Sequence, residues 1–194
     1  MLFVFLGFLA FFHVSEYALV WVFNPSELSR DSWLISKPYC LAMSLAVLEY
    51  LAESALFLSA KGSDLIGWTG AGMMVVGEGL RKSAILTAKS SFTLQIRTRR
   101  DPSERVVDHG VYRYCRHPGY LGWMMWCLGS QIFLKNPICF VIFAFWSWRF
   151  FAERIPYEED LLLDMFGLEY RKYAQRTRVW IPFVRSPIAL RYSS

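Results

Sequence analysis

The sequence has few of the residues that build metal centres and disulfide frameworks. It contains three histidines and four cysteines among 194 residues. No two cysteines form the close C-x-x-C pair of zinc sites and redox motifs, and His13 lies in an apolar stretch. We therefore expect no metal ion, and we interpret the thiols as buried side chains of the fold, at Cys40, Cys115, Cys127 and Cys139.

Hydrophobic residues, in contrast, make up 55% of the chain and aromatic residues 18%. A soluble domain has roughly 45–50% apolar residues. The excess collects in blocks about as long as the ~20 residues that cross a bilayer as a helix, which predicts an integral membrane protein. The first block, residues 1–23, has no basic segment before it and no small-residue cleavage site, so it fits a retained span better than a signal peptide.

The hydrophobic pattern predicts an all-α fold with about five transmembrane helices. The expected spans are residues 1–23, 39–58, 65–86, 120–134 and 138–151. The last two are short, but Asn136-Pro137 between them is a turn signal, so we expect them to form a helical hairpin. Glycines in the third span, among them Gly67, Gly70 and Gly72, indicate close packing against a neighbouring helix.

Basic residues predict which side of the membrane each connection faces, because Lys and Arg are retained in cytoplasmic loops. Seven lie in residues 89–116, and another seven in the tail from Arg154 to Arg191. Both segments are therefore expected in the cytosol, which also places residues 28–37 there and Met1 in the lumen. The net charge of +5 then lies beside anionic lipid headgroups, so it requires no nucleic-acid partner.

Four carboxylates fall inside the expected spans, at Glu16, Glu49, Glu53 and Glu78. Such groups are costly in hydrocarbon and mark functional positions by default. Glu78 has a structural explanation, since Arg81 and Lys82 at i+3 and i+4 are placed to pair with it. Glu49 and Glu53 share a helix face, and both a structural and a functional role stay open for them.

Two segments combine charge, aromatic rings and turn-forming residues at the ends of spans. The first contains Arg116-His117-Pro118-Gly119-Tyr120 and precedes the fourth span. Its rings and arginines are either interfacial and lipid-facing anchors, or they surround a helix N-terminus that binds an anionic group.

The second segment, residues 148–160, contains Arg154, Pro156 and Glu158. Proline interrupts the hydrogen bonds of a helix, so we expect the fifth span to end near Arg154 and a new helix to begin near Pro156. The acidic residues after the proline then suit the N-terminal turn of that helix. The apolar spacing from Leu161 to Tyr173 predicts an amphipathic C-terminal helix along the membrane surface.

These segments and several others resemble isoprenylcysteine carboxyl methyltransferase over nearly the whole chain. The matching stretches are Phe12-His13-Val14-Ser15-Glu16-Tyr17, Gly77-Glu78-Gly79-Leu80-Arg81-Lys82, Gly110-Val111-Tyr112, Arg116-His117-Pro118-Gly119-Tyr120, Asn136-Pro137, Arg149-Phe150-Phe151 and Arg154-Ile155-Pro156-Tyr157-Glu158-Glu159. The Arg-His-Pro-x-Tyr core also occurs in related membrane methyltransferases and sterol reductases. The first and last stretches narrow the resemblance, which is closest to the plant-like form; animal members have eight spans, of which this chain looks to lack the first.

The resemblance implies an S-adenosylmethionine-dependent enzyme that methylates the C-terminal carboxylate of farnesylated or geranylgeranylated CaaX proteins, such as small GTPases. Matching positions assign cofactor contacts to Arg97, Glu104, Arg105, Val106, Val107, Tyr112, His117, Pro118, Gly119, Tyr120 and Glu158. Arg154 takes the place of the substrate-binding arginine, and Arg154 and Glu158 are the expected catalytic residues. Some members have a glutamine where Arg97 stands, so Gln95 is an alternative contact.

The implied chemistry needs no general base, because an α-carboxyl with a pKa of about 3.3–3.7 is already ionised at neutral pH. Alignment for in-line displacement and exclusion of water remain as the tasks of the protein. We expect residues 1–88 to form N-terminal transmembrane helices and residues 89–194 a catalytic region, facing the cytosol from the endoplasmic reticulum. The alternatives are an NADPH-dependent isoprenoid or sterol reductase, a phospholipid methyltransferase, and a non-enzymatic helical scaffold.

Overall fold

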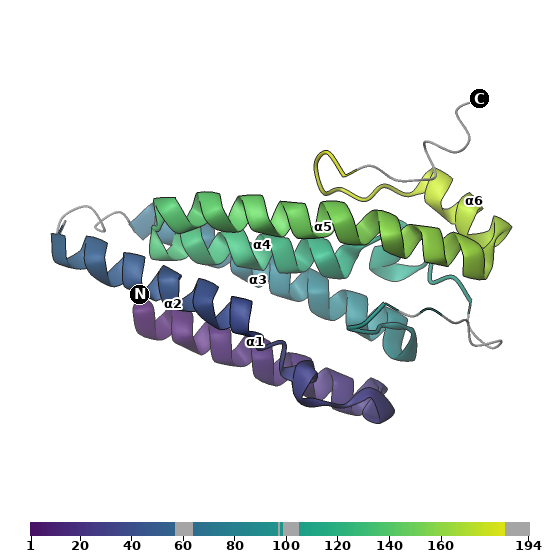
Figure 1. The fold of residues 1–194 in the computed structure, drawn as a ribbon, viewed down its shortest axis with the longest axis horizontal. Coiled ribbons are helices and arrows are strands. Elements are labelled where there is room, and N and C mark those ends of the chain that lie inside the picture. The colour runs from purple at the N-terminus through teal and green to yellow at the C-terminus, as the bar shows by residue number, and fades with distance from the viewer. Residues whose placement is uncertain (57–63, 97, 99–104, 185–194) are drawn as a thin grey trace. The chain divides into compact units, whose positions relative to one another are not determined.

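The computed structural model describes residues 1–56, 64–96, 98 and 105–184. The described chain is helical, as predicted, apart from one isolated β-bridge between Cys115 and Arg178. Its α-helices, drawn in Figure 1, are α1 (Leu2–Phe23), α2 (Lys37–Leu56), α3 (Asp64–Ala88), α4 (Pro118–Leu134), α5 (Pro137–Phe166) and α6 (Leu168–Arg176). Short 3-10 turns, η1 (Pro25–Glu27), η2 (Arg30–Trp33), η3 (Lys89–Ser91) and η4 (Gly110–Arg113), lie in the connections.

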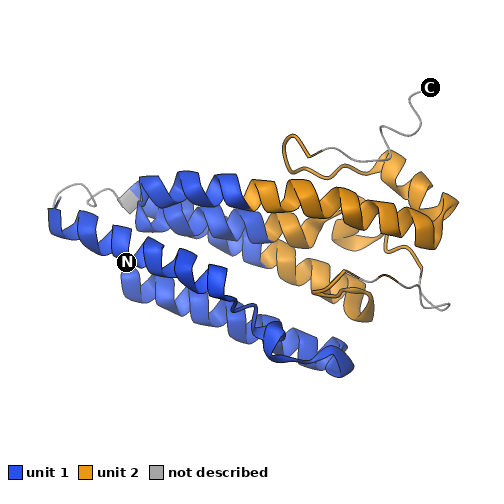
Figure 2. Cartoon of the chain, in the orientation of Figure 1, with its two compact units in different colours: residues 1–78, 123–146 blue, residues 79–122, 147–194 orange. Residues whose placement is uncertain are grey.

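The chain divides into two compact units, coloured separately in Figure 2. Unit 1 contains residues 1–78 and 123–146, and unit 2 contains residues 79–122 and 147–194. Helices α3, α4 and α5 each contribute residues to both units. The expected boundary at residue 88, between N-terminal transmembrane helices and a catalytic region, is a division by function, and it stays a prediction.

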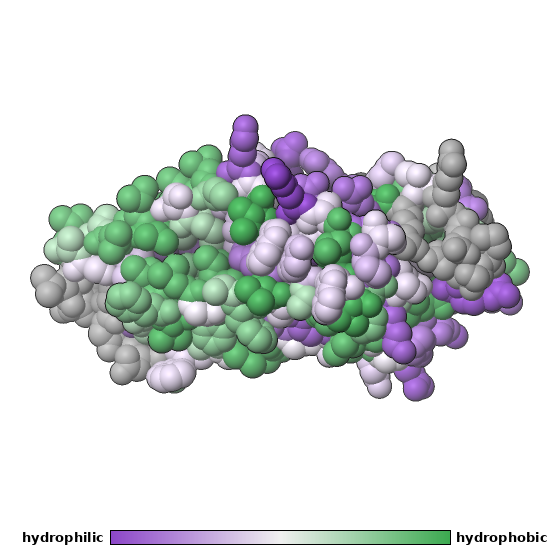
Figure 3. Space-filling model, turned by 90° about the horizontal axis from the view of Figure 1, so that it is seen from below, coloured by the Kyte–Doolittle hydropathy of each residue, from purple (hydrophilic) through white to green (hydrophobic). Residues whose placement is uncertain are grey.

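Unit 1 presents an apolar surface of the kind that suits a bilayer. Large hydrophobic side chains are exposed on α1, α2 and α3, for example Phe3, Leu48 and Trp68. On the face shown in Figure 3, hydrophobic residues gather over α1 and α2. Two stretches within the described residues, Leu2–Phe23 and Arg30–Leu56, are long and apolar enough to cross a membrane. The other three expected spans stay predictions.

Cys40, on α2, is exposed, so the interpretation of all four thiols as buried was wrong at this position. The reason is that α2 carries an exposed apolar surface, of the kind that marks a membrane site, on which a small side chain need not be covered by protein. The other three thiols are buried.

Inside unit 1, α1, α3 and α4 pack around Phe5, Phe12, Met74 and Trp126. Close approach of α3 to α4 requires glycine at Gly70, because a Cβ atom there would collide with backbone atoms of α4. The predicted helix packing therefore holds at this position. At Gly72, by contrast, a Cβ atom would meet no atom within 4 Å.

Two polar residues in unit 1 have structural partners. The carboxylate of Glu49 accepts hydrogen bonds from the backbone N–H groups of Ile138 and Cys139, each at 2.7 Å, and so caps the N-terminus of α5. His13 connects α1 to the following segments, because its Nδ1 lies 2.7 Å from the carbonyl oxygen of Trp33. This geometry assigns Glu49 a structural role.

Helix α5 runs unbroken through Pro156, so the expected helix break was wrong. An interior proline costs a helix roughly 3 kcal/mol and one hydrogen bond. Tertiary packing on both sides offsets that cost here, since Ile155 and Glu159 are both fully buried. The helix ends instead at Gly167, whose φ of 54° is readily available to glycine. The expected surface helix is consequently divided between the end of α5 and α6.

Candidate active site

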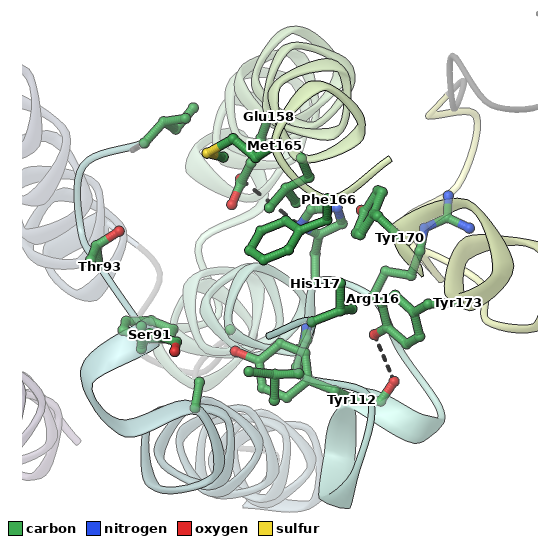
Figure 4. A pocket seen from close by; sticks show the side chains of 18 of the residues that line it. Ser91, Thr93, Tyr112, Arg116, His117, Glu158, Met165, Phe166, Tyr170 and Tyr173 are labelled. Atoms are coloured by element: carbon green, nitrogen blue, oxygen red, sulfur yellow. Dashed lines mark hydrogen bonds and ion pairs between the residues drawn. The ribbon is translucent and has the colours of Figure 1, made fainter. Parts of the chain in front are cut away.

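A cavity in unit 2 lies among elements that are distant in the sequence. Figure 4 shows Ser91 and Thr93 on one side of it, with Glu158, Met165 and Phe166 of α5 on another. Its full lining is Ala88, Ser91, Phe92, Thr93, Ile96, Arg105, Val106, Val107, Tyr112, Arg116, His117, Pro118, Gly119, Tyr120, Glu158, Leu162, Met165, Phe166, Tyr170 and Tyr173. The cavity thus combines a carboxylate, hydroxyls, backbone groups and several aromatic rings.

The first turn of α4 forms one wall. Pro118 begins this helix, a position where the missing N–H of proline costs nothing. Gly119 lets this wall approach the segment that carries Phe92, because a Cβ atom on Gly119 would lie 3.0 Å from the Phe92 ring. Arg81 donates a 3.1 Å hydrogen bond to the carbonyl oxygen of Gly119, and its guanidinium lies over the Phe92 ring. The turn is therefore held from α3.

Arg154 and Glu158 lie one turn apart on α5, and Tyr120 of α4 joins them. Arg154 donates from Nε to the Tyr120 hydroxyl at 2.8 Å, and that hydroxyl donates to Glu158 Oε2 at 2.6 Å. Arg154 also donates from Nη2 to the carbonyl oxygen of Leu94, and its guanidinium lies over the rings of Tyr120 and Phe150. This chain of hydrogen bonds fixes a cation, Arg154, beside the cavity and a carboxylate, Glu158, inside it.

A second, buried polar network adjoins the cavity, whose lining includes two of its members, Arg116 and His117. Arg116 donates from Nε and Nη2 to the two carboxylate oxygens of Glu159, at 2.6 and 3.3 Å. Its Nη1 donates to the carbonyl oxygens of Ala174 and Thr177, at 2.8 and 2.5 Å. His117 Nε2 lies 3.1 Å from the same carboxylate. One arginine therefore binds the start of α4 to α5 and to the chain after α6.

This second network decides one alternative and corrects one expectation. Arg116 is buried, which excludes the alternative of a lipid-facing anchor for this residue. Glu159 is not in a first helical turn, because α5 continues through the proline. A continuous α5 places Glu159 on the same face as Phe151 and Ile155, all fully buried, and a carboxylate on such a face requires a charged partner. That signal was hidden by the assumed break at Pro156.

Burial controls the protonation of several groups around the cavity. It raises the pKa of Tyr112 well above its ordinary value, and the negative charge of Glu158 adds to the shift. Burial likewise raises the pKa of the Cys115 thiol to about 11. At neutral pH Tyr112 is therefore a neutral hydroxyl donor and Cys115 an unreactive thiol.

Most of the residues expected at the site converge. The cavity lining includes Arg105, Val106, Val107, Tyr112, His117, Pro118, Gly119, Tyr120 and Glu158. Arg154 lies next to it through Tyr120. Arg97 and Glu104 lie outside the described residues, and Gln95 is exposed.

Several lining residues were not expected from the sequence. Phe92, Met165, Phe166, Tyr170 and Tyr173 belong to stretches that carry no motif. The only signal for the last three was the amphipathic spacing of the C-terminal helix, which indicates burial but not what the side chains surround. Among the described residues, no group of three or more His, Cys, Asp or Glu side chains is arranged to hold a metal ion.

Comparison with known proteins identifies relatives of this chain. A model of the isoprenylcysteine carboxyl methyltransferase family matches residues 70–164. The chain is 48% identical to protein-S-isoprenylcysteine O-methyltransferase B of Arabidopsis thaliana, over 90% of this chain and 89% of that protein. It is 40% identical to protein-S-isoprenylcysteine O-methyltransferase of Mus musculus, over 91% of this chain and 63% of the relative. A solved structure of the eukaryotic intramembrane Ras methyltransferase of this family matches with a TM-score of 0.90 and 36% identity, over 94% of this chain and 66% of that one.

Proposed function

The chain belongs to the isoprenylcysteine carboxyl methyltransferase family, and we propose that it methylates the α-carboxylate of a C-terminal prenylcysteine with S-adenosylmethionine as methyl donor. It is an enzyme, as its named relatives are. The observation that carries the assignment is Arg154, a cation held through Tyr120 beside a cavity that contains the Glu158 carboxylate.

The chemistry of the cavity lining suits S-adenosylmethionine. Glu158 offers a carboxylate to positive charge, Ser91 and Thr93 offer hydroxyls, and Phe92 and Phe166 offer flat faces to an adenine ring. When bound, the cofactor supplies a methyl group on a sulfonium, an electrophile that an oxygen nucleophile displaces. The proposed contacts remain Arg97, Glu104, Arg105, Val106, Val107, Tyr112, His117, Pro118, Gly119, Tyr120 and Glu158.

Arg154 orients the acceptor carboxylate. Two of its donors are already used, Nε toward Tyr120 and Nη2 toward Leu94, so the plane of the guanidinium is fixed. Its remaining N–H groups lie in that plane and can donate to a carboxylate there. The arginine therefore fixes the orientation of the acceptor carboxylate as well as neutralising its charge. Because Tyr120 also donates to Glu158, the acceptor and cofactor positions are fixed to each other by one hydroxyl.

The prenyl chain partitions into lipid, at about 0.8 kcal/mol per buried methylene, so the substrate reaches the site from within the bilayer. We place the enzyme in the endoplasmic reticulum membrane with five spans and the site facing the cytosol. At one end of unit 1 a Cβ atom on Gly67 would meet the side chains of Met1 and Lys135, which supports placing these residues on one side of the membrane.

The test is transfer of labelled methyl from S-adenosylmethionine to N-acetyl farnesylcysteine by the purified protein. N-acetyl cysteine, which has the carboxylate without the prenyl group, is the matched control. We expect a base-labile methyl ester on the prenylated acceptor and none on the control. Equal methylation of both would contradict a prenylcysteine site, and NADPH consumption without methyl transfer would favour the reductase alternative.

A further inference from the structure

The chain after α6 carries exposed aromatic and basic side chains that the methyl transfer does not use. Together with the turn before α4 they form what we call the tail surface, made up of Arg113, Tyr114, Arg178, Trp180 and Phe183. Tyr114, Trp180 and Phe183 are 70%, 61% and 89% exposed. The indole N–H of Trp180 donates to the carbonyl oxygen of Tyr114 at 2.7 Å, which brings the two segments together.

The tail surface has a defined conformation, because contacts hold its backbone in place while its rings point outward. Val179 and Ile181 are buried on either side of the exposed Trp180, and Pro182 and Phe183 after them are exposed. Trp180 and Phe183 have φ values of 66° and 59°, a conformation that side chains other than glycine rarely adopt. Strained backbone of this kind persists only where surrounding contacts hold it. The segment thus places its aliphatic side chains in the protein and its rings outside.

The position of the rings along α5 indicates what covers them. The indole N–H of Trp148 donates to the carbonyl oxygen of Pro182 at 2.9 Å, directly before Phe183. Trp148 lies near the end of the fifth expected span, residues 138–151, where the helix is expected to leave the bilayer. Tryptophan and tyrosine rings concentrate at this level of a membrane protein, and arginines there meet lipid phosphates.

We propose that the tail surface is a binding site for anionic phospholipid headgroups of the cytosolic leaflet. Its two arginines, Arg113 and Arg178, are both exposed and complement the negative potential of that leaflet. The tail surface belongs to the same unit as the cavity, and the carbonyl oxygen of Arg178 accepts a hydrogen bond from the backbone N–H of Arg116, a cavity-lining residue, at 3.0 Å. Lipid bound there would hold the segment whose Thr177 carbonyl oxygen accepts a hydrogen bond from Arg116.

The experiment places an environment-sensitive dye at Phe183→Cys, in a Cys40→Ser background that removes the exposed native thiol. The full-length protein is reconstituted in nanodiscs of phosphatidylcholine with or without phosphatidylserine. A dye at Gln175→Cys, on the exposed side of α6, is the matched control. We expect the dye at position 183 to shift its emission to shorter wavelength and to be quenched by nitroxide lipids labelled near the headgroup, more strongly with phosphatidylserine present.

The added effect of phosphatidylserine is expected to disappear in the Arg113→Gln, Arg178→Gln double variant, while the dye at position 175 responds to neither lipid. Quenching by aqueous iodide, equal at positions 183 and 175, would overturn the proposal. So would protection of the dye only after a prenylated peptide is added, because that result identifies the tail surface as a protein-binding site. The measurement involves no methyl transfer, so its outcome is independent of the proposed function.

Discussion

A substitution at Arg154 distinguishes the two roles that an arginine can have at the end of a membrane span. A lipid-facing cation is replaced by lysine with little loss, whereas a fork that orients a carboxylate is not. We expect Arg154→Lys to lose one charge-assisted contact of roughly 1.5–3 kcal/mol, or about ten- to a hundredfold in kcat/KM, with folding intact. Steady-state kinetics with N-acetyl farnesylcysteine measures the loss.

Arg149 provides the control, because it lies on the same helix and forms an exposed ion pair with Glu153 at 3.1 Å. Arg149→Lys is expected to keep its activity, and the detergent-solubilised yield of both variants checks folding. Full activity of Arg154→Lys would remove the carboxylate-orienting role while leaving the methyltransferase assignment in place.

A substitution at His117 tests whether the start of α4 contacts the cofactor. Its ring stacks on Tyr120, with centroids 5.5 Å apart, and its Nε2 contacts the buried Glu159 carboxylate. Replacing it by alanine removes one wall contact and loosens the first turn of α4. We expect His117→Ala to raise the dissociation constant of S-adenosylhomocysteine more than the KM for the prenylated acceptor. Calorimetric titration of the purified protein decides this, and an unchanged dissociation constant would mean that His117 serves only the turn.

At the scale of elements, Arg116 connects the start of α4, the end of α5 and the segment after α6. Arg116→Lys keeps a charge for Glu159 but cannot also reach the carbonyl oxygens of Ala174 and Thr177. Each buried acceptor left unsatisfied costs roughly 1–3 kcal/mol. We therefore expect faster tryptic cleavage after Arg178, together with weaker cofactor binding, because Tyr170 and Tyr173 of the cavity wall belong to the released element.

The control for this variant is Arg176→Lys, whose arginine forms an exposed ion pair with Asp108 and contributes little stability. Slow cleavage of Arg116→Lys with unchanged cofactor affinity would show that the tail is held by its apolar contacts alone.

Elements and their order were predictable where local sequence decides them. The starts and ends of the first three expected spans each lie within two residues of those of α1, α2 and α3, apart from residues outside the described range. Pro156 shows where local rules fail, since the helix continues where Ile155 is fully buried and Glu159 pairs with Arg116, a residue distant in sequence. Glu49 likewise caps α5 across 89 residues, a partner that no periodicity reveals.

At the scale of the whole molecule, the proposed five-span topology predicts that both basic segments lie in the cytosol. Single cysteines at the exposed positions Thr98 and Gln175 report on the location of these two segments. A cysteine at Ser29 reports on the connection after α1. In sealed vesicles of one orientation, with Cys40 replaced, we expect an impermeant thiol reagent to label all three from the same side. A cysteine at Lys135 is expected to label from the opposite side, and labelling of all four from one side would contradict the five-span arrangement.

The central claim is that this chain transfers methyl to a prenylcysteine carboxylate, and a competition measures it most directly. The purified protein in nanodiscs receives S-adenosylmethionine and NADPH together with N-acetyl farnesylcysteine, phosphatidylethanolamine and an unsaturated isoprenoid. Mass spectrometry then identifies every product. The account predicts one product, the methyl ester of the prenylcysteine, which forms about ten- to a hundredfold more slowly when Arg154→Lys replaces the native protein at low acceptor concentration. A methylated phospholipid or a reduced isoprenoid, without that ester, would contradict it.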